Sequence, residues 1–118
     1  MRRQVAILIF DDVEVLDFAG PFEVFAVTDQ LHEHAAWSTF TIAETPGTVR
    51  AVNGLKIVPG HTLESTPAPD VLVVPGGIGT RALLQRPALI EWIRTRSKRA
   101  EIVMSVCTGA LLLAKAGL

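Results

Sequence analysis

The chain has 118 residues, of which 49% are hydrophobic and 19% are charged. This composition predicts one globular domain with a packed core and excludes a disordered chain. Eleven basic and twelve acidic residues leave a net charge of −1, so there is no electrostatic basis for binding nucleic acid or an anionic membrane. No apolar run approaches the roughly 20 residues that cross a bilayer. The run Val5–Phe10 is too short for a signal peptide and ends at two aspartates, so we expect a cytoplasmic protein.

Cys107 is the only cysteine, which excludes an internal disulfide bond and a zinc site made of several cysteines. His32 and His34 are interpreted as solvated residues near a helix end, and His61 is placed in a loop. These histidines show no metal-ligand spacing with other candidate ligands. We therefore expect a protein that holds no metal.

The first half of the chain predicts two strands around one helix. Val5–Ile9 is a continuous apolar run, which is typical of a strand buried on both faces in a parallel sheet. Pro21–Asp29 has helical apolar spacing, with its proline in the first turn. Trp37–Ala43 alternates more and predicts a strand nearer an edge of the sheet.

A small hairpin and a second buried strand follow. Thr48–Ala51 and Leu55–Val58 are short β-prone runs that flank the pair Asn53-Gly54, a pattern that predicts a tight β-hairpin. Val71–Val74 is again continuously apolar and predicts a buried strand.

The last third repeats the alternation of helix and strand. Pro87–Arg99 predicts a helix, Ile102–Val106 a buried strand, and Thr108–Ala116 a final helix with Gly117 as its C-cap. The basic end of the first of these helices favours a solvated helix terminus that complements the dipole over a nucleic-acid patch. Together the elements predict an α/β fold: a doubly wound, mostly parallel sheet with a small β-hairpin. Ligands of such sheets bind at the carboxyl ends of the strands.

Cys107 lies at one of these carboxyl ends. In Ser105-Val-Cys-Thr-Gly109 a strand runs into the cysteine and a helix follows at once, which is the spacing of a nucleophile elbow. The flanking small residues let the turn tighten, and the following helix N-terminus favours a thiolate. A buried core cysteine is the alternative, but the spacing favours a functional thiol.

Two further segments end neighbouring strands. In Val74-Pro-Gly-Gly-Ile78, paired glycines allow close backbone approach, so amides at Gly77 and Thr108 could form an oxyanion hole beside the sulfur. An ordinary turn is the alternative for this motif. After the first strand, Glu14 and Asp17 are candidates for an acid or base, and they could equally be helix-capping carboxylates.

These three segments resemble the DJ-1/PfpI (ThiJ) superfamily, nearest to isonitrile hydratase-like proteins and to the amidase-like sensor domain of AraC-type regulators. The resemblance rests on Leu16–Phe25, Asp70–Gly77 and Ser105–Leu118 and runs over essentially the whole chain. It implies a flavodoxin-like fold of the class I glutamine amidotransferase-like type, usually dimeric. Family domains continue past the elbow helix, so we expect residues 1–118 to form one C-terminally incomplete domain whose apolar last helix needs a covering surface.

The resemblance also implies site residues and functions. Asp17, Cys107 and Thr108 match the catalytic residues of isonitrile hydratases, and Glu14 is the secondary candidate because other family members use a glutamate against the cysteine. The implied function is a cofactor-free cysteine enzyme, a lyase that hydrates isonitriles to N-substituted formamides. The alternatives are a metabolite-sensing domain of a transcriptional regulator, and a stress-related glyoxalase or oxidation sensor. The expected partners are a small molecule and a second copy of the chain, with neither nucleic acid nor membrane.

Overall fold

The computed structural model describes residues 2–118. Its centre is a five-stranded sheet with the strand order β5-β2-β1-β6-β7, in which every neighbouring pair is parallel. The strands, in chain order, are β1 (Arg3–Leu8), β2 (Trp37–Ala43), β5 (His61–Thr62), β6 (Val71–Val74) and β7 (Ile102–Ser105). The predicted parallel sheet is confirmed, and so is the burial of β1 and β6. The prediction of a buried strand is wrong for β7, in which Ile102 and Met104 are 46% and 39% exposed, because β7 lies at an edge of the sheet and one of its faces is only partly covered.

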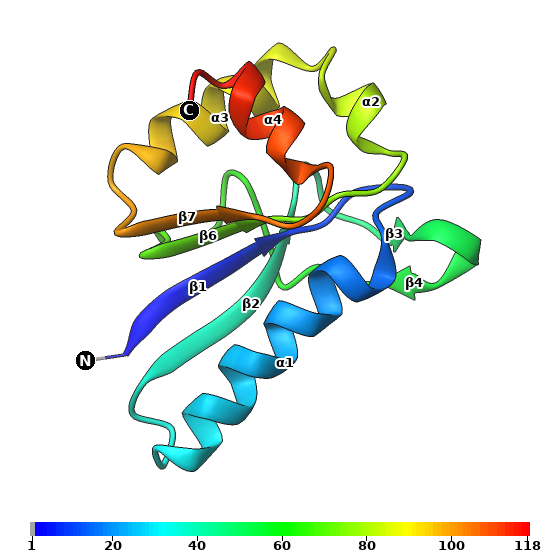
Figure 1. The fold of residues 1–118 in the computed structure, drawn as a ribbon. Helices are drawn as coiled ribbons and strands as arrows, with labels where there is room; N and C mark the ends of the chain where they lie inside the picture. The colour runs from blue at the N-terminus through cyan, green and yellow to red at the C-terminus, as the bar shows by residue number, and fades with distance from the viewer. Residues whose placement is uncertain (1) are drawn as a thin grey trace.

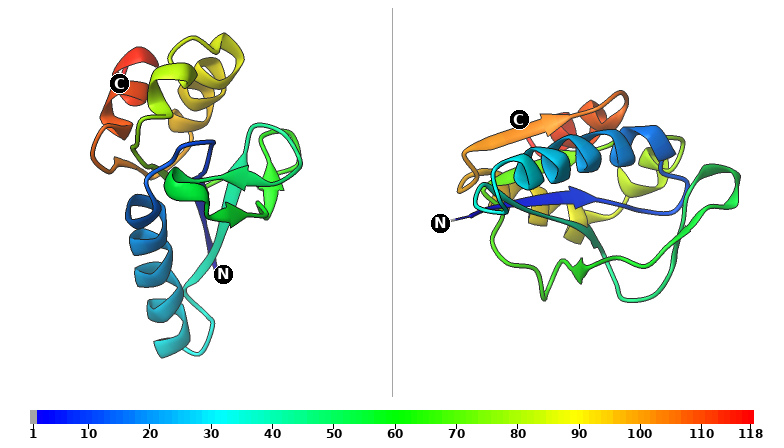
Figure 2. Two further views of the ribbon diagram at one scale, coloured as in Figure 1. Left: turned by 90° about the vertical axis from the view of Figure 1, so that its right-hand side faces the viewer. Right: turned by 90° about the horizontal axis from the view of Figure 1, so that it is seen from below.

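Helices cover both faces of this sheet (Figures 1 and 2). The long helix α1 (Val15–Leu31) lies on one face, and the short helix α2 (Thr80–Leu83), α3 (Pro87–Ser97) and α4 (Gly109–Lys115) lie on the other. Since crossover helices lie on both faces, the sheet is doubly wound, as the alternation of elements predicted.

Burial on both faces explains why the sequences of the two central strands, β1 and β6, are apolar without alternation. The side chains of Val5–Leu8 in β1 and of Val71–Val74 in β6 are at most 1% exposed. A strand between two helical layers has no solvent face, so polar residues are excluded from both of its sides.

Helix α1 differs from its predicted bounds. It begins at Val15, after Glu14 in extended conformation, so Pro21 lies inside the helix and not in its first turn. Proline has no N–H to donate to the carbonyl four residues earlier, that of Asp17, and therefore weakens the helix locally. Packing compensates, because Phe18 is buried and Phe22 packs against the same core.

The hairpin and the edge of the sheet also differ in detail. The strands β3 (Val49–Arg50) and β4 (Lys56–Ile57) pair antiparallel, as predicted, but a 3-10 turn over Val52–Gly54 joins them in place of a two-residue turn. His61 lies in strand β5 and not in a loop, and its ring packs edge-on against Phe40 at 4.9 Å between centroids.

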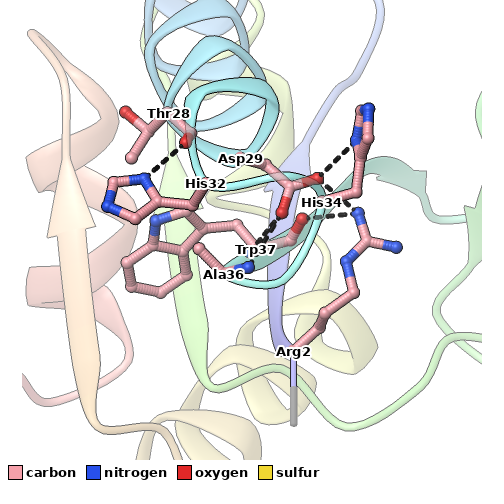
Figure 3. Close-up of polar contacts among 7 residues, drawn as sticks. All are labelled: Arg2, Thr28, Asp29, His32, His34, Ala36 and Trp37. Atoms are coloured by element: carbon pink, nitrogen blue, oxygen red, sulfur yellow. Dashed lines mark hydrogen bonds and ion pairs between the residues drawn. The ribbon is translucent and has the colours of Figure 1, made fainter.

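A buried carboxylate joins the far end of α1 to the first two strands (Figure 3). Asp29 is 3% exposed, and its Oδ1 accepts hydrogen bonds from the amides of Ala36 (3.0 Å) and Trp37 (2.9 Å). Its Oδ2 accepts from Arg2 at 2.6 Å and lies 3.1 Å from Nδ1 of His34. His34, predicted to be a solvated residue, is largely exposed but contributes to this cluster.

The same contacts set the ionisation of Asp29. Burial disfavours its charged form, but hydrogen bonds from the Trp37 and Ala36 amides, from Arg2 and from His34 outweigh that effect and lower its pKa from 3.8 to about 2. Because folding lowers this pKa, the ionised carboxylate stabilises the fold at pH values above the pKa of the unfolded chain. The stabilisation is lost as pH falls through the folded value.

We therefore expect Asp29→Asn to lower Tm at neutral pH, because an amide cannot accept all four bonds. Glu101→Gln is the matched control, since it removes an exposed ion pair with Arg3. Thermal melts monitored by circular dichroism should show a larger loss for Asp29→Asn at pH 7 and a shrinking difference between pH 4 and pH 2. Equal losses in both variants at neutral pH would contradict this account of α1.

Candidate active site

The carboxyl ends of β1, β6 and β7 meet at one edge of the sheet, because these strands are neighbours and parallel. From β1 the chain goes to β2 on one side, whereas β6 pairs on the other side, so the strand order reverses between β1 and β6. Such reversal points form the crevice in which open α/β sheets bind ligands. The start of α1, the segment after β6 and the turn before α4 all lie at this end of the sheet (Figure 1).

Cys107 occupies the turn between β7 and α4 in a strained conformation. Its φ of +53° lies in the left-handed region, which costs a non-glycine residue on the order of 1–3 kcal/mol. The amide of Val106 donates to the Val74 carbonyl at 3.0 Å, so β7 remains paired up to the turn. Cys107 itself is exposed, in contrast to the alternative of a buried core cysteine.

Close backbone packing explains the small residues around the cysteine. A Cβ atom at Gly109 would overlap the carbonyl oxygen of Val74. Gly77 has a φ of +124°, and a Cβ atom there would lie 2.5 Å from the Glu14 amide nitrogen and 2.6 Å from the Asp12 carbonyl oxygen. At these two positions only glycine lets the backbone segments approach so closely.

Thr108 is hydrogen-bonded to the segment after β6. Its Oγ1 accepts from the Gly77 amide at 2.9 Å. An anion at this position would therefore compete with Thr108 for that amide. The Thr108 amide, by contrast, donates to no acceptor within residues 2–118.

The two carboxylates follow β1 and differ in their contacts. Oδ2 of Asp17 accepts from the Gly76 amide at 3.3 Å, so this side chain turns toward the strand ends. Glu14 is the residue before α1, and its side chain makes no capping hydrogen bond, although its own amide donates to the Gly76 carbonyl at 3.0 Å. The capping interpretation is therefore wrong for Glu14.

A single pocket of about 250 Å³ collects the predicted site residues. Cys107, Thr108, Gly77, Asp17 and Glu14 all line it. Four other lining residues were not among the predicted site residues, and they come from the turn after the glycines, from α2 and from α4. They are Ile78, Thr80, Arg81 and Leu111.

A second cavity, of about 170 Å³, lies beside the carboxyl ends of β1 and β2. Its charged lining includes Glu44 and Arg86, whose carboxylate and Nε lie 2.8 Å apart. It contains none of the residues that the sequence motifs single out.

Within residues 2–118, no three histidine, cysteine, aspartate or glutamate side chains cluster as metal ligands. In the same range no helix has both the length and the apolar character that crossing a membrane requires.

The fold and the site define a class: an α/β protein in which an exposed cysteine on a strand-to-helix turn shares a pocket with carboxylates that follow another strand. The model of the DJ-1/PfpI family matches residues 3–118, and the chain belongs to this family. Over 118 residues it is 36% identical to an isonitrile hydratase of Pseudomonas putida, covering 100% of this chain and 49% of that protein.

The chain is also similar to a protein of known structure and to a transcriptional regulator. A crystal structure of a THiJ/PfpI family protein from Pseudomonas syringae superposes with a TM-score of 0.90 at 32% identity, covering 100% of this chain and 47% of that one. The HTH-type transcriptional regulator GbdR of Pseudomonas aeruginosa is 26% identical over 116 residues, covering 98% of this chain and 31% of the regulator. The chain thus spans about half the length of the isonitrile hydratase and of the P. syringae protein.

The packing at the elbow predicts a large cost for Gly109→Ala. The added Cβ meets backbone that cannot move without disturbing β6, so we expect a loss of about 2–3 kcal/mol in the free energy of unfolding. Gly20→Ala is the control. Apart from its chain neighbours, the added Cβ would meet only a Leu16 methyl at 3.9 Å. The cost of a Cβ before Pro21 in a helix opposes the better helix propensity of alanine, so we expect a much smaller change than at Gly109. Urea unfolding measures both variants. Equal stability of the two would contradict the close approach described for Gly109.

Proposed function

We propose that this chain carries the catalytic centre of a cofactor-free cysteine enzyme, a lyase that hydrates isonitriles to N-substituted formamides. The observation that carries the proposal is that Cys107, Thr108 and Asp17 line one pocket. Support comes from the 36% identity to an isonitrile hydratase, which extends over the whole chain. The activity is that of the whole protein, of which this chain contributes the cysteine and the carboxylates.

In the first step, the Asp17 carboxylate accepts the Cys107 thiol proton and the sulfur attacks the terminal carbon of the isonitrile. Asp17 then returns this proton to the same carbon. An S–C bond and a C–H bond form, the carbon–nitrogen triple bond becomes a double bond, and the product is a thioimidate on Cys107. The Thr108 amide, which makes no hydrogen bond within residues 2–118, orients this adduct, and the Gly77 amide joins it only by giving up its bond to Thr108 Oγ1.

In the second step, water completes the reaction. The Asp17 carboxylate removes a proton from a water molecule, whose oxygen attacks the thioimidate carbon. The C–S bond breaks, the sulfur recovers a proton, and the nitrogen ends with the hydrogen of the formamide. Overall, one isonitrile and one water give one N-substituted formamide, and the reaction needs no oxidant or reductant.

Two features favour Asp17 over Glu14 as the carboxylate in these steps. Asp17 is held against the Gly76 amide, in the segment that also contacts Thr108. Glu14 is exposed and its side chain has no such anchor. A fixed base contributes more than a mobile one, because its position is set before the reaction begins.

A second candidate function is the binding of a small metabolite as the sensor domain of a transcriptional regulator. The match to an HTH-type regulator over 98% of this chain favours it. In that case the pocket of Cys107 binds its ligand without turnover, and the DNA-binding part is another domain of the same protein.

We further propose that the chain assembles as a homodimer through α1. Along its outer face Leu16, Val24 and Leu31 are 75%, 66% and 78% exposed. Their spacing places them in one stripe along the helix. An exposed apolar stripe of this length is typical of an interface.

Activity assays of matched variants test the chemistry. We expect Cys107→Ala to abolish formamide production from a simple alkyl isonitrile, followed through the formyl proton by NMR. Asp17→Asn should lower kcat about 10²- to 10⁴-fold because it removes the proton carrier, whereas Glu14→Gln should stay within about fivefold of wild type. Loss of activity in Glu14→Gln with retention in Asp17→Asn would transfer the role to Glu14. Full activity of Cys107→Ala would refute the role of Cys107 as the nucleophile.

Light scattering after size-exclusion chromatography tests the dimer. Val24→Lys places a charge on the α1 stripe and should shift the mass from dimer to monomer, because burying an unpaired charge is costly. Val58→Lys is the control, since Val58 is 79% exposed on another part of the surface. A wild-type monomer, or equal masses for both variants, would refute the α1 interface.

A further inference from the structure

We propose that Arg81 forms a carboxylate-binding subsite beside Cys107, so that the substrates of this pocket carry an anionic group near the reacting carbon. The substrate class, carboxylate-bearing isonitriles, rests on the proposed function. The charge selection itself does not, because any electrophile that reaches Cys107 would experience it.

The first observation is that the Arg81 side chain has no partner among the residues that the structure describes. It lines the pocket of Cys107, and it makes no ion pair or side-chain hydrogen bond within residues 2–118. Arg2, Arg3, Arg86 and Arg94 pair with a carboxylate. Of the arginines that form no ion pair within the described residues, Arg81 is the one that lines this pocket. The planar guanidinium of Arg81 therefore keeps its donors available for a ligand carboxylate, which it can bind through two parallel hydrogen bonds.

The second observation is that the backbone of Arg81 is fixed relative to the site. Thr80 is 1% exposed and its hydroxyl donates to the Gly77 carbonyl at 2.9 Å. The Arg81 amide donates to the Ile78 carbonyl at 3.3 Å. Arg81 thus lies in the short helix α2, which is bonded to the glycine segment that also contacts Thr108 and Asp17. A side chain on an anchored backbone loses less freedom when it binds a ligand.

The third observation is the distribution of the other lining groups. Glu14 and Asp17 are negative and repel an anion, so the Arg81 region is the part of the pocket that accepts one. Ile78 and Leu111 are 57% and 48% exposed and line the same pocket, where they supply apolar contact. A substrate with a short apolar body and a carboxylate matches this combination.

Alkylation of Cys107 measures the charge effect directly. Iodoacetate and iodoacetamide both form an S–C bond with the thiolate and release iodide, but only iodoacetate is anionic. Because Cys107 is the only cysteine and is exposed, intact mass spectrometry gives both rates whether or not the thiol is catalytic. The ratio of the two rates cancels any change in the thiolate fraction.

We expect Arg81→Gln to lower the iodoacetate-to-iodoacetamide ratio about two- to fivefold, as for an exposed charge pair. In Arg81→Lys, which keeps the positive charge, the iodoacetate-to-iodoacetamide rate ratio should stay close to that of wild type. Arg99→Gln is the control, because it removes the same charge from the exposed end beyond α3. Raising the salt from about 0.05 M to about 1 M should abolish the difference by screening. An unchanged ratio in Arg81→Gln, or an equal fall in Arg99→Gln, would overturn the subsite.

A substrate comparison tests the carboxylate class. With isocyanoacetate and its neutral methyl ester, Arg81→Gln should lower kcat/KM for the acid and leave that for the ester within about twofold. Equal losses of kcat/KM for the acid and the ester would overturn the assignment of Arg81 to the substrate carboxylate. If neither compound is hydrated by wild type, the proposed function fails, and the alkylation ratio alone decides whether Arg81 selects anions.

Discussion

The site depends on one constraint, the direct contact of three backbone segments at the carboxyl ends of β1, β6 and β7. Gly109 packs on the Val74 carbonyl, and Gly77 packs on the backbone of Asp12 and Glu14. No side chain larger than hydrogen fits between them. These contacts hold the elbow of Cys107 in its left-handed conformation and bring the start of α1 beside it. The strain at Cys107 is sustained because its surroundings are fixed on both sides.

The far end of α1 is fixed by different chemistry. Asp29 is buried and accepts hydrogen bonds from Arg2, just before β1, and from the amides of Ala36 and Trp37, where β2 begins. The near end is set by backbone packing. Between these two ends the helix contains Pro21 and packs its aromatic side chains on the sheet. Asp17, in the first turn, therefore belongs to an element that is anchored at both ends, and this is what a positioned acid or base requires.

The sheet and the elbow could be predicted from the sequence because each has a strong local signal: continuous apolar runs for β1, β6 and β7, and small residues around Cys107. Other features have no such signal. The start of α1 was missed because Pro21 suggested a first turn, whereas aromatic packing overrides the missing N–H. The bond between Thr108 and Gly77 and the position of Arg81 arise from tertiary contacts across the sheet. The short strand β5 owes its conformation to pairing with β2.

The central claim is that Cys107 forms a covalent bond with the isonitrile carbon. Intact-mass analysis of the wild-type protein, acid-quenched during turnover of an alkyl isonitrile and followed by peptide mapping, tests it most directly. The account predicts a gain equal to one isonitrile, located on Cys107. Formamide production without any adduct, or an adduct on another residue, would contradict it.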